Sequence, residues 1–350
     1  MNKRVSIEVD GKRTVVGHGI TVRKALEIAG YKLTKYPEKG SLFVPCEVGG
    51  CWSCAVLVDG ELKPACITVV EEGIRIRAEP PEDYPPRRIV HGFTGHTVGG
   101  VGTPWWLKGE RGYIEAACFA AGCNLRCPQC QNWETTYMGK GRALTPHEAA
   151  KIMTETRRRF GVDRMAISGG ESTLNRRWLV QYVKGLKELN PDANARIHVD
   201  TNATILTRDY IDELVEAGMT DIGPDLKGYY PETFMRITAI GDRTLAERYL
   251  STEWDTVRYL IKQYKHRVFT GVGIPYNKQL ITGQEVGLIG EKLYEIDPKI
   301  QVCVLDYRPE FERLDLVKPK YDEMLEIQGI LRSKGLRVVV CQTEHGHIGP

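Results

Sequence analysis

Residues 114–130, IEAACFAAGCNLRCPQC, join a run of apolar residues to a loop that carries three cysteines. The apolar run has the length and character of a buried strand. The loop holds Cys123, Cys127 and Cys130 in a C-x3-C-x2-C spacing. We therefore expect the three thiols to lie just beyond the end of a strand, at the edge of the sheet where α/β folds bind their ligands.

Strands and helices alternate from this segment to the end of the chain. Two helix starts are marked by Thr145 with Glu148 and by Thr282 with Glu285, which have the Thr-x-x-Glu spacing of a capping box. Such alternation implies a parallel sheet, either open or closed into a barrel. Six further apolar segments have the character of strands: residues 164–170, 196–202, 220–226, 268–274, 300–307 and 336–341.

Polar side chains gather at the ends of three of these expected strands. They form the groups SGGE (168–171), DTN (200–202) and DLK (225–227). Because the carboxyl ends of parallel strands meet at one edge of the sheet, these groups should surround the cysteine loop. The sequence thus predicts one polar site beside the three thiols.

The spacing of the three cysteines favours an iron–sulfur cluster. Three thiolates on one short loop can bind three irons of a cube-shaped cluster, although such clusters usually have four cysteine ligands. A missing fourth ligand leaves one iron open to a substrate, as in catalytic metal sites generally. The alternatives are a zinc knuckle or cysteines that only pack. A zinc site would need a fourth Cys or His close to the loop in the sequence, and none is there.

A second cysteine group lies nearer the N-terminus. Cys46, Cys51 and Cys54 have the C-x4-C-x2-C spacing of plant-type 2Fe–2S ferredoxins, and Cys66 supplies a fourth thiolate. Four protein ligands leave no iron open, so we expect a metal centre for electron transfer and not for catalysis. A structural four-cysteine zinc site is the alternative. The strand-like segments on both sides favour iron.

Changes in composition divide the chain into two expected domains. Residues 1–80 alternate as strands around one helix at 21–30, which suggests a β-grasp fold. Residues 81–109 begin with a proline- and charge-rich stretch and are expected to be a linker. Their glycine-rich part, 91–106, is either an ordered loop of the site or the end of the linker, and we expect the latter. Residues 110–350 form the second domain.

The cysteine loop and the polar strand ends resemble the radical S-adenosylmethionine superfamily. The resemblance rests on the C-x3-C-x2-C loop after one strand and on Gly169, Gly170 and Glu171 after the next, and it covers about residues 110–345. Within the superfamily, three motifs look most like the pyruvate formate-lyase activating enzyme group: DTN (200–202), DLK (225–227) and GIPYN (273–277).

The fold that this resemblance implies is α/β. It is a partial (β/α)6 barrel of the TIM type, and the small β-grasp, ferredoxin-like domain precedes it. The implied cofactors are a 4Fe–4S cluster, a 2Fe–2S cluster and S-adenosylmethionine.

In this family the three cysteines of the central loop are catalytic. Cys123, Cys127 and Cys130 would hold the 4Fe–4S cluster, and its open iron would chelate S-adenosylmethionine. One electron would break an S–C bond of S-adenosylmethionine, and the 5′-deoxyadenosyl radical would take a hydrogen atom from the substrate. The 2Fe–2S cluster, held by the four N-terminal cysteines, would deliver that electron or receive one back.

The resemblance also implies contacts to S-adenosylmethionine. Glu171 would hold the methionine ammonium, and Asp200 and Asn202 the methionine carboxylate or the ribose hydroxyls. Asp225, together with Asp200, resembles the acidic pair that holds a monovalent cation in the activating enzymes, and Lys227 follows in the same motif. The implied cofactor-binding residues are Gly169, Gly170, Glu171, Asp200, Asn202, Asp225 and Lys227.

One position departs from the family pattern. The residue before the third cysteine is usually aromatic and lies beside the adenine, but here it is Gln129. Trp133 either takes over that stacking or is a packing residue. We expect the remaining cysteines, Cys118, Cys303 and Cys341, to be buried in the core.

Two histidine features carry little functional weight. We expect His198, on the strand that leads to the DTN motif, to be structural. The tail at residues 344–347 contains two histidines, which alone are weak evidence for a metal site.

Composition and charge exclude two classes of partner. The 350 residues carry a net charge of +3, which gives no reason to expect a nucleic-acid partner. No segment is apolar over the length that a membrane span needs, and the first residues lack the apolar core of a signal peptide. We expect a cytoplasmic protein without a membrane partner.

The expected function is that of an oxygen-sensitive radical oxidoreductase. The resemblance implies that it abstracts hydrogen from a protein substrate, as glycyl-radical activating enzymes do. One alternative is the same radical chemistry on a small molecule or lipid, and another is a non-catalytic electron carrier with two clusters. The expected electron partner is a donor of the ferredoxin or flavodoxin type.

Overall fold

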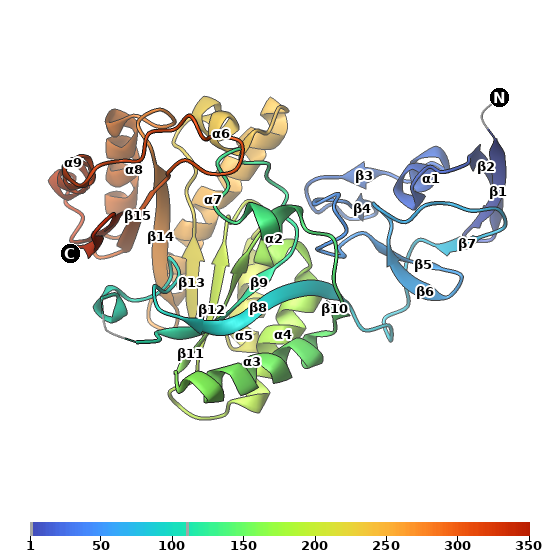
Figure 1. Cartoon of the computed structure of the whole chain (residues 1–350), viewed down its shortest axis with the longest axis horizontal. Helices are drawn as coiled ribbons and strands as arrows, with labels where there is room; N and C mark the ends of the chain where they lie inside the picture. Colours follow the sequence, from blue (N-terminus) through green and yellow to red (C-terminus); the bar gives the residue numbers. More distant parts are fainter. Residues whose placement is uncertain (1–2, 110–111) are drawn as a thin grey trace.

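The computed structural model describes residues 3–109 and 112–350. A small N-terminal domain lies beside a larger α/β domain, and the N-terminal strands and the C-terminal strand are at opposite ends of the molecule (Figure 1). The predicted domain boundary at residue 110 lies outside the described residues, as do residues 1 and 2. Among the described residues, no helix is both long and apolar enough to cross a membrane.

The N-terminal domain is a small twisted sheet with one helix. Its strands follow the order β2-β1-β7-β5-β6. The hairpin between β1 and β2 turns at Asp10 and Gly11, with φ angles of 45° and 78°, as the Asp-Gly pair favours. The bounds are β1 (Arg4–Val9), β2 (Lys12–Gly17), α1 (Val22–Ile28), β3 (Leu33–Thr34), β4 (Leu42–Phe43), β5 (Ala55–Val58), β6 (Glu61–Pro64) and β7 (Arg75–Arg77). This arrangement agrees with the predicted ferredoxin-like domain.

The larger domain is built on a ten-stranded sheet with the order β10-β8-β9-β11-β12-β13-β14-β15-β16-β17. The neighbours from β9 to β16 pair in parallel, whereas β8, β10 and β17 are antiparallel additions at the two edges. The bounds are β8 (Arg88–His96), β9 (Glu115–Ala120), β10 (Ala143–Leu144), β11 (Arg164–Gly169), β12 (Arg196–Thr201), β13 (Asp221–Pro224), β14 (Phe269–Tyr276), β15 (Gln301–Asp306), β16 (Val338–Thr343) and β17 (Gly346–Ile348). Each apolar segment that the sequence marks as a strand is one of the parallel strands, so the prediction of a partial barrel is confirmed.

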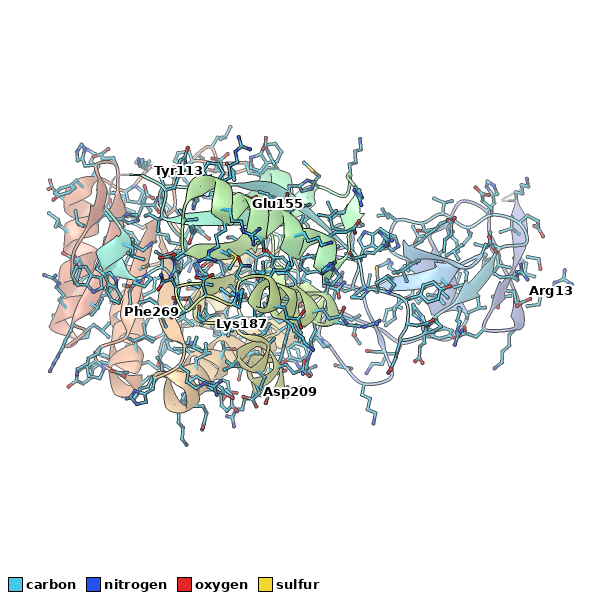
Figure 2. All side chains as sticks on the ribbon, turned by 90° about the horizontal axis from the view of Figure 1, so that it is seen from below. Arg13, Tyr113, Glu155, Lys187, Asp209 and Phe269 are labelled. Carbon is cyan, nitrogen blue, oxygen red and sulfur yellow. The ribbon has the colours of Figure 1, made fainter. Side chains whose placement is uncertain are left out.

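Helices cover the outer face of the curved sheet (Figure 1). Glu155, Lys187 and Asp209 lie in this helical layer, on α3, α4 and α5 (Figure 2). The bounds are α2 (Trp133–Tyr137), α3 (Pro146–Phe160), α4 (Arg176–Leu189), α5 (Arg208–Ala217), α6 (Pro231–Thr238), α7 (Arg243–Tyr264), α8 (Gly283–Ile296) and α9 (Tyr321–Ser333). Thr145 and Glu148 form the predicted capping box at the start of α3.

Part of the expected linker is a strand. β8 pairs with β9 along the sheet edge, and its first three residues are buried. A bulge between His91 and Thr94 interrupts the pairing, and Gly92 there has a φ of 66°. The sequence did not predict this strand, because it is rich in glycine and because the bulge interrupts the alternation of apolar and polar residues by which strands are recognised.

Charged side chains are buried at the N-terminal ends of the parallel strands. Arg164 Nη1 donates to Asp221 Oδ1 over 3.0 Å, and Arg164 Nε lies 3.7 Å from Glu115 Oε2. His198 Nδ1 lies 3.4 Å from the same oxygen of Glu115. Burial alone would raise the pKa of Asp221, but Arg164 and Arg196 outweigh it and lower that pKa. The pKa of Glu115 is likewise lowered, because His198, His96 and Arg164 outweigh its burial. His198 is thus a partner of a buried acid.

Replacement of Arg164 by methionine is expected to destabilise the larger domain by about 3–5 kcal/mol, because it leaves the buried carboxylate of Glu115 without a guanidinium and that of Asp221 with Arg196 alone. A drop in melting temperature, measured by circular dichroism, would show this effect. Arg176→Met is the matched control, since its partners Asp209 and Glu213 are exposed and such pairs contribute less than about 1 kcal/mol. Equal losses in the two variants would contradict this account.

Candidate active site and cluster loops

The barrel encloses a cavity of about 310 Å³ at the cysteine loop. Most of the residues predicted for the site line it together, although they come from four different strand ends. This convergence follows from the parallel sheet, whose carboxyl ends share one edge. The predicted residues that line the cavity are Cys123, Cys127, Cys130, Gly169, Gly170, Asp200, Asn202, Asp225 and Lys227.

The three thiols of the loop have surroundings that suit a positively charged cluster. Burial raises the pKa of the Cys127 thiol to about 12 and that of Cys123 as well, so both need a cation to become thiolates. Cys123 Sγ accepts from the Leu125 amide over 3.4 Å and faces Asn202 Nδ2 at 3.7 Å. Such donors stabilise the sulfur charge of a bound cluster.

No group of three or more His, Cys, Asp or Glu side chains within the described part of the chain is arranged to hold a single metal ion. In a 4Fe–4S cluster, each cysteine thiolate binds a different iron, so the sulfurs stand farther apart than around one ion. The chemistry of the donors, three thiols on one loop beside amide donors, fits a cluster.

Acidic and basic groups face each other on the cavity wall. Lys227 Nζ donates to Asp225 Oδ2 over 2.9 Å and lies 3.5 Å from the Tyr307 hydroxyl. Burial would lower the pKa of Lys227, but the charge of Asp225 outweighs it and holds the pKa well above its ordinary value. Asp200 Oδ1 lies 3.0 Å from His198 Nε2. The ammonium of Lys227 is therefore retained beside the predicted cluster loop.

Glu171, the residue predicted to hold the methionine ammonium, has a carboxylate that is bound by the protein. It is 1% exposed and is not among the residues that line the cavity. Its carboxylate accepts from the Thr173 amide over 2.9 Å, from the Thr201 hydroxyl over 2.6 Å and from the Asn202 amide over 2.6 Å. Both oxygens are thus bound by the protein, so Glu171 holds the DTN segment in place and does not present a free carboxylate to a ligand.

The glycine-rich segment that we expected to end the linker forms part of the cavity wall. Val98, Gly99, Gly100 and Val101 all line the cavity. Glycine is needed there because a Cβ at Gly100 would meet the carboxylate of Asp200. The segment is thus an ordered part of the site. Its many glycines are the sequence feature that could have indicated this, because glycine allows the backbone to approach other groups closely.

Gly100→Ala is expected to displace Asp200 and to weaken S-adenosylmethionine binding at least about 10-fold, in the range seen when partners of a metal site are lost. Equilibrium binding to the cluster-loaded protein measures the effect. Gly241→Ala is the control, because a Cβ there meets nothing within 4 Å. Unchanged binding in Gly100→Ala would show that the segment tolerates a side chain.

Further residues that line the cavity come from regions that were predicted to be core or C-terminal tail. Cys303 is buried as predicted, yet it also lines the cavity. His347, in the tail, lines it as well, and burial lowers the pKa of His347 to about 4. Trp133 stacks on Phe311 with ring centroids 5.2 Å apart, as a packing residue does. The periodic pattern could not show that the C-terminal strands close the cavity.

Gln129, which stands where the family has an aromatic residue, is fully buried. Its amide donates to the carbonyl of Ile237 over 2.8 Å. It is not among the residues that line the cavity.

The four N-terminal cysteines are buried and converge on one point. Cys51 Sγ lies 3.1 Å from Cys46 Sγ. Cys46, Cys54 and burial raise the pKa of the Cys66 thiol. The Ser53 hydroxyl donates to Cys51 Sγ over 3.2 Å. Hydrogen bonds from Cys51 and Cys66 lower the pKa of Cys46 well below its ordinary value. Four converging thiols with a hydroxyl donor fit the predicted 2Fe–2S cluster.

Comparison with known proteins adds relatives for the central part of the chain. Residues 118–279 match the model of the radical SAM superfamily. The chain is also similar to "Probable GTP 3′,8-cyclase" of Methanocaldococcus jannaschii. Identity to the cyclase is 32% over 120 residues, which is 34% of this chain and 38% of the relative. A "PqqA peptide cyclase" of Bradyrhizobium diazoefficiens is 33% identical over 30% of this chain and 26% of its own. The chain therefore matches well under half the length of these relatives.

Among solved structures, SuiB of Streptococcus suis bound to S-adenosylmethionine aligns with a TM-score of 0.49 and 13% identity, over 64% of this chain and 49% of that one. The N-terminal part, residues 2–81, matches the model of a 2Fe-2S iron-sulfur cluster binding domain. The cofactors of the two domains are a 4Fe–4S cluster with S-adenosylmethionine and a 2Fe–2S cluster, as the sequence predicts. The chain therefore carries a domain of the radical SAM superfamily behind an N-terminal 2Fe–2S iron–sulfur cluster binding domain.

Proposed function

We propose that the protein is a radical enzyme that cleaves S-adenosylmethionine reductively and abstracts hydrogen from a second substrate. When bound, the 4Fe–4S cluster supplies the electron that breaks S-adenosylmethionine into methionine and a 5′-deoxyadenosyl radical. The observation that carries the proposal is the single cavity in which the three thiols of one loop meet the polar ends of β11, β12 and β13.

The chain's own residues bind and orient in this proposal. Cys123, Cys127 and Cys130 hold the cluster. Asp200 and Asn202 contact the polar groups of S-adenosylmethionine. Gly169 and Gly170 line the cavity and let the end of β11 pack closely against the start of the cysteine loop, because a Cβ at either position would strike Ala120 or Gly122. Asp225 and Lys227 complete the polar wall.

The substrate that we favour is a small molecule or a short peptide segment. The proposed radical chemistry would take place in a partly open cavity of about 310 Å³. The relatives bear the names GTP 3′,8-cyclase and PqqA peptide cyclase, which describe a nucleotide and a peptide as reactants. Hydrogen abstraction from a folded protein, in the manner of activating enzymes, is the second candidate. An electron donor of the ferredoxin or flavodoxin class completes the reaction.

The experiment is an anaerobic assay of the protein with both clusters loaded. S-adenosylmethionine and dithionite are added, and 5′-deoxyadenosine is quantified by chromatography. Product that depends on both additions supports the radical enzyme. No product from a protein that carries both clusters would overturn it and favour an electron carrier.

The choice between substrate classes needs a second assay. The small-molecule fraction and the protein fraction of a cell extract are added separately, and each is tested for an increase in 5′-deoxyadenosine above the rate without substrate. We expect the increase with the small-molecule fraction. An increase only with the protein fraction would favour the activating role.

A further inference from the structure

The two cluster loops touch each other directly. Gly122 immediately precedes Cys123, and a Cβ on it would lie 2.9 Å from Cys46 Cβ and 3.2 Å from Cys46 Sγ. From the other side, a Cβ on Gly50 would lie 2.8 Å from the carbonyl carbon of Ala121. Glycine at both positions therefore lets a ligand of one predicted cluster approach the backbone beside a ligand of the other.

One arginine joins the same two loops. Arg126 lies between Cys123 and Cys127, and its guanidinium donates to the carbonyl of Cys123 over 2.6 Å and to that of Leu125 over 2.9 Å. The other arm of the guanidinium donates to the carbonyl of Cys46. A single rigid, charged group is thus hydrogen-bonded to the backbone of a cysteine in each loop.

The loop that carries Cys46, Cys51 and Cys54 makes further hydrogen bonds to the barrel. The Ile89 amide donates to the Gly50 carbonyl over 3.1 Å, and Asn175 Nδ2 donates to the Cys51 carbonyl over 3.1 Å. The Ser53 hydroxyl donates to the Leu174 carbonyl over 2.8 Å. The backbone around the N-terminal thiols is therefore fixed to the elements that carry the central site.

We propose that Gly50, Gly122 and Arg126 form an electron junction through which the 2Fe–2S cluster reduces the 4Fe–4S cluster. The proposal rests on the function proposed above. One electron from a reduced donor of the ferredoxin class enters the 2Fe–2S cluster. The same electron passes to the 4Fe–4S cluster, so that the first cluster is reoxidised and the second is reduced by one electron. Inward flow suits the proposed function, because each reductive cleavage of S-adenosylmethionine consumes one electron at the 4Fe–4S cluster.

Arg126 acts in this junction as a positioning residue. Its hydrogen bonds fix the distance between the two loops, and its charge lies beside both sites. A reduced cluster carries one more negative charge than an oxidised one, and a nearby guanidinium stabilises that charge. Loss of Arg126 should therefore slow transfer between the clusters while leaving the entry of the electron unchanged.

The test follows each cluster separately in the full-length, anaerobically loaded protein. Oxidised protein is mixed with a fully reduced flavodoxin, which contains no iron–sulfur cluster, and freeze-quenched samples are examined by electron paramagnetic resonance, which distinguishes the two reduced clusters. In the unmodified protein we expect the 2Fe–2S signal to rise first and then to decay as the 4Fe–4S signal appears. In Arg126→Gln the first phase should be unchanged, and the second at least about 10-fold slower, in the range for lost partners of metal sites.

Arg248→Gln is the matched control. Arg248 also ties the N-terminal domain to the barrel, since it bonds Glu38 over 2.7 Å and covers the Tyr36 ring at 3.6 Å, but it does so through α7. We expect both phases to be unchanged in this variant. Equal slowing in Arg248→Gln would mean that only general docking matters, and it would overturn the junction.

Two further variants keep the test decisive. If Arg126→Gln fails to load iron, Gly50→Ala replaces it, because its Cβ pushes the loops apart from the 2Fe–2S side. Cys54→Ser removes a ligand of the 2Fe–2S cluster and should abolish the second phase. Reduction of the 4Fe–4S cluster at an undiminished rate in Gly50→Ala or Cys54→Ser would overturn the proposal. Dithionite-driven formation of 5′-deoxyadenosine by the unmodified protein tests the proposed function independently, because dithionite bypasses the junction.

Discussion

Replacement of Cys127 by alanine is expected to abolish the formation of 5′-deoxyadenosine. The loop contains three thiols, and all three are needed as ligands of the 4Fe–4S cluster. Loss of a mere partner of a metal ligand already costs about 10–100-fold in affinity or activity, so loss of a ligand itself should cost more than about 100-fold. Burial keeps the pKa of the Cys127 thiol at about 12, so this thiol has no evident role without the cluster.

Three measurements on the same sample check this result. Iron content and the absorption of the 4Fe–4S cluster should fall, the 2Fe–2S signal should stay, and product should disappear. Cys341→Ala is the matched control, because Cys341 is also buried but lies on β16 and does not line the cavity. Full activity in Cys127→Ala, with the cluster intact, would refute the assignment of this loop.

The fold was predictable from the sequence because the parallel strands are buried on both faces. Their apolar runs stand out against the helices, and β9 to β16 follow those runs closely. The family was predictable because the cysteine spacing is local. The likeness to radical SAM enzymes is confirmed, whereas the closer likeness to activating enzymes stays a prediction.

Contacts between distant segments were not predictable from local patterns. Thr282 caps α8 as expected, but the carboxylate of Glu285 leaves the capping box and instead accepts from the Tyr229 amide over 2.8 Å and from the Thr233 hydroxyl over 2.7 Å. The glycine-rich wall of the cavity was not predicted either, because its contacts also join segments that are distant in the sequence. Gly100 is explained by Asp200 and Gly102 by Ile222, which both lie far along the sequence and close in space.

Glu171 is the residue whose role changes most between sequence and structure. The motif implies a direct contact to the methionine ammonium, yet the carboxylate is enclosed and accepts bonds from Thr173, Thr201 and Asn202. Asn202 in turn faces Cys123 Sγ at 3.7 Å. The geometry therefore favours a positioning role for Glu171, in which it would act on the cluster loop and on S-adenosylmethionine through the DTN segment.

Glu171→Gln is expected to weaken S-adenosylmethionine binding about 10–100-fold and to destabilise the protein by about 2–4 kcal/mol, because hydrogen bonds to a charged acceptor contribute about 1.5–3 kcal/mol each. Equilibrium binding to the loaded protein and thermal unfolding measure the two effects. Thr201→Val removes one of these hydrogen bonds and leaves the carboxylate in place. It should reproduce part of the loss in binding.

The double variant Glu171→Gln, Thr201→Val separates the two roles. If Glu171 acts through Thr201, the second substitution adds little to the first, and the two effects on binding fall short of their sum by about 0.5–3 kcal/mol. If Glu171 instead contacts the ammonium directly, the effects add, since the two side chains then contribute to different interactions. Additivity, together with normal binding in Thr201→Val, would restore the role that the motif implies. Strong coupling would mean that the acidic residue of this motif holds the neighbouring strand end in place for the ligand.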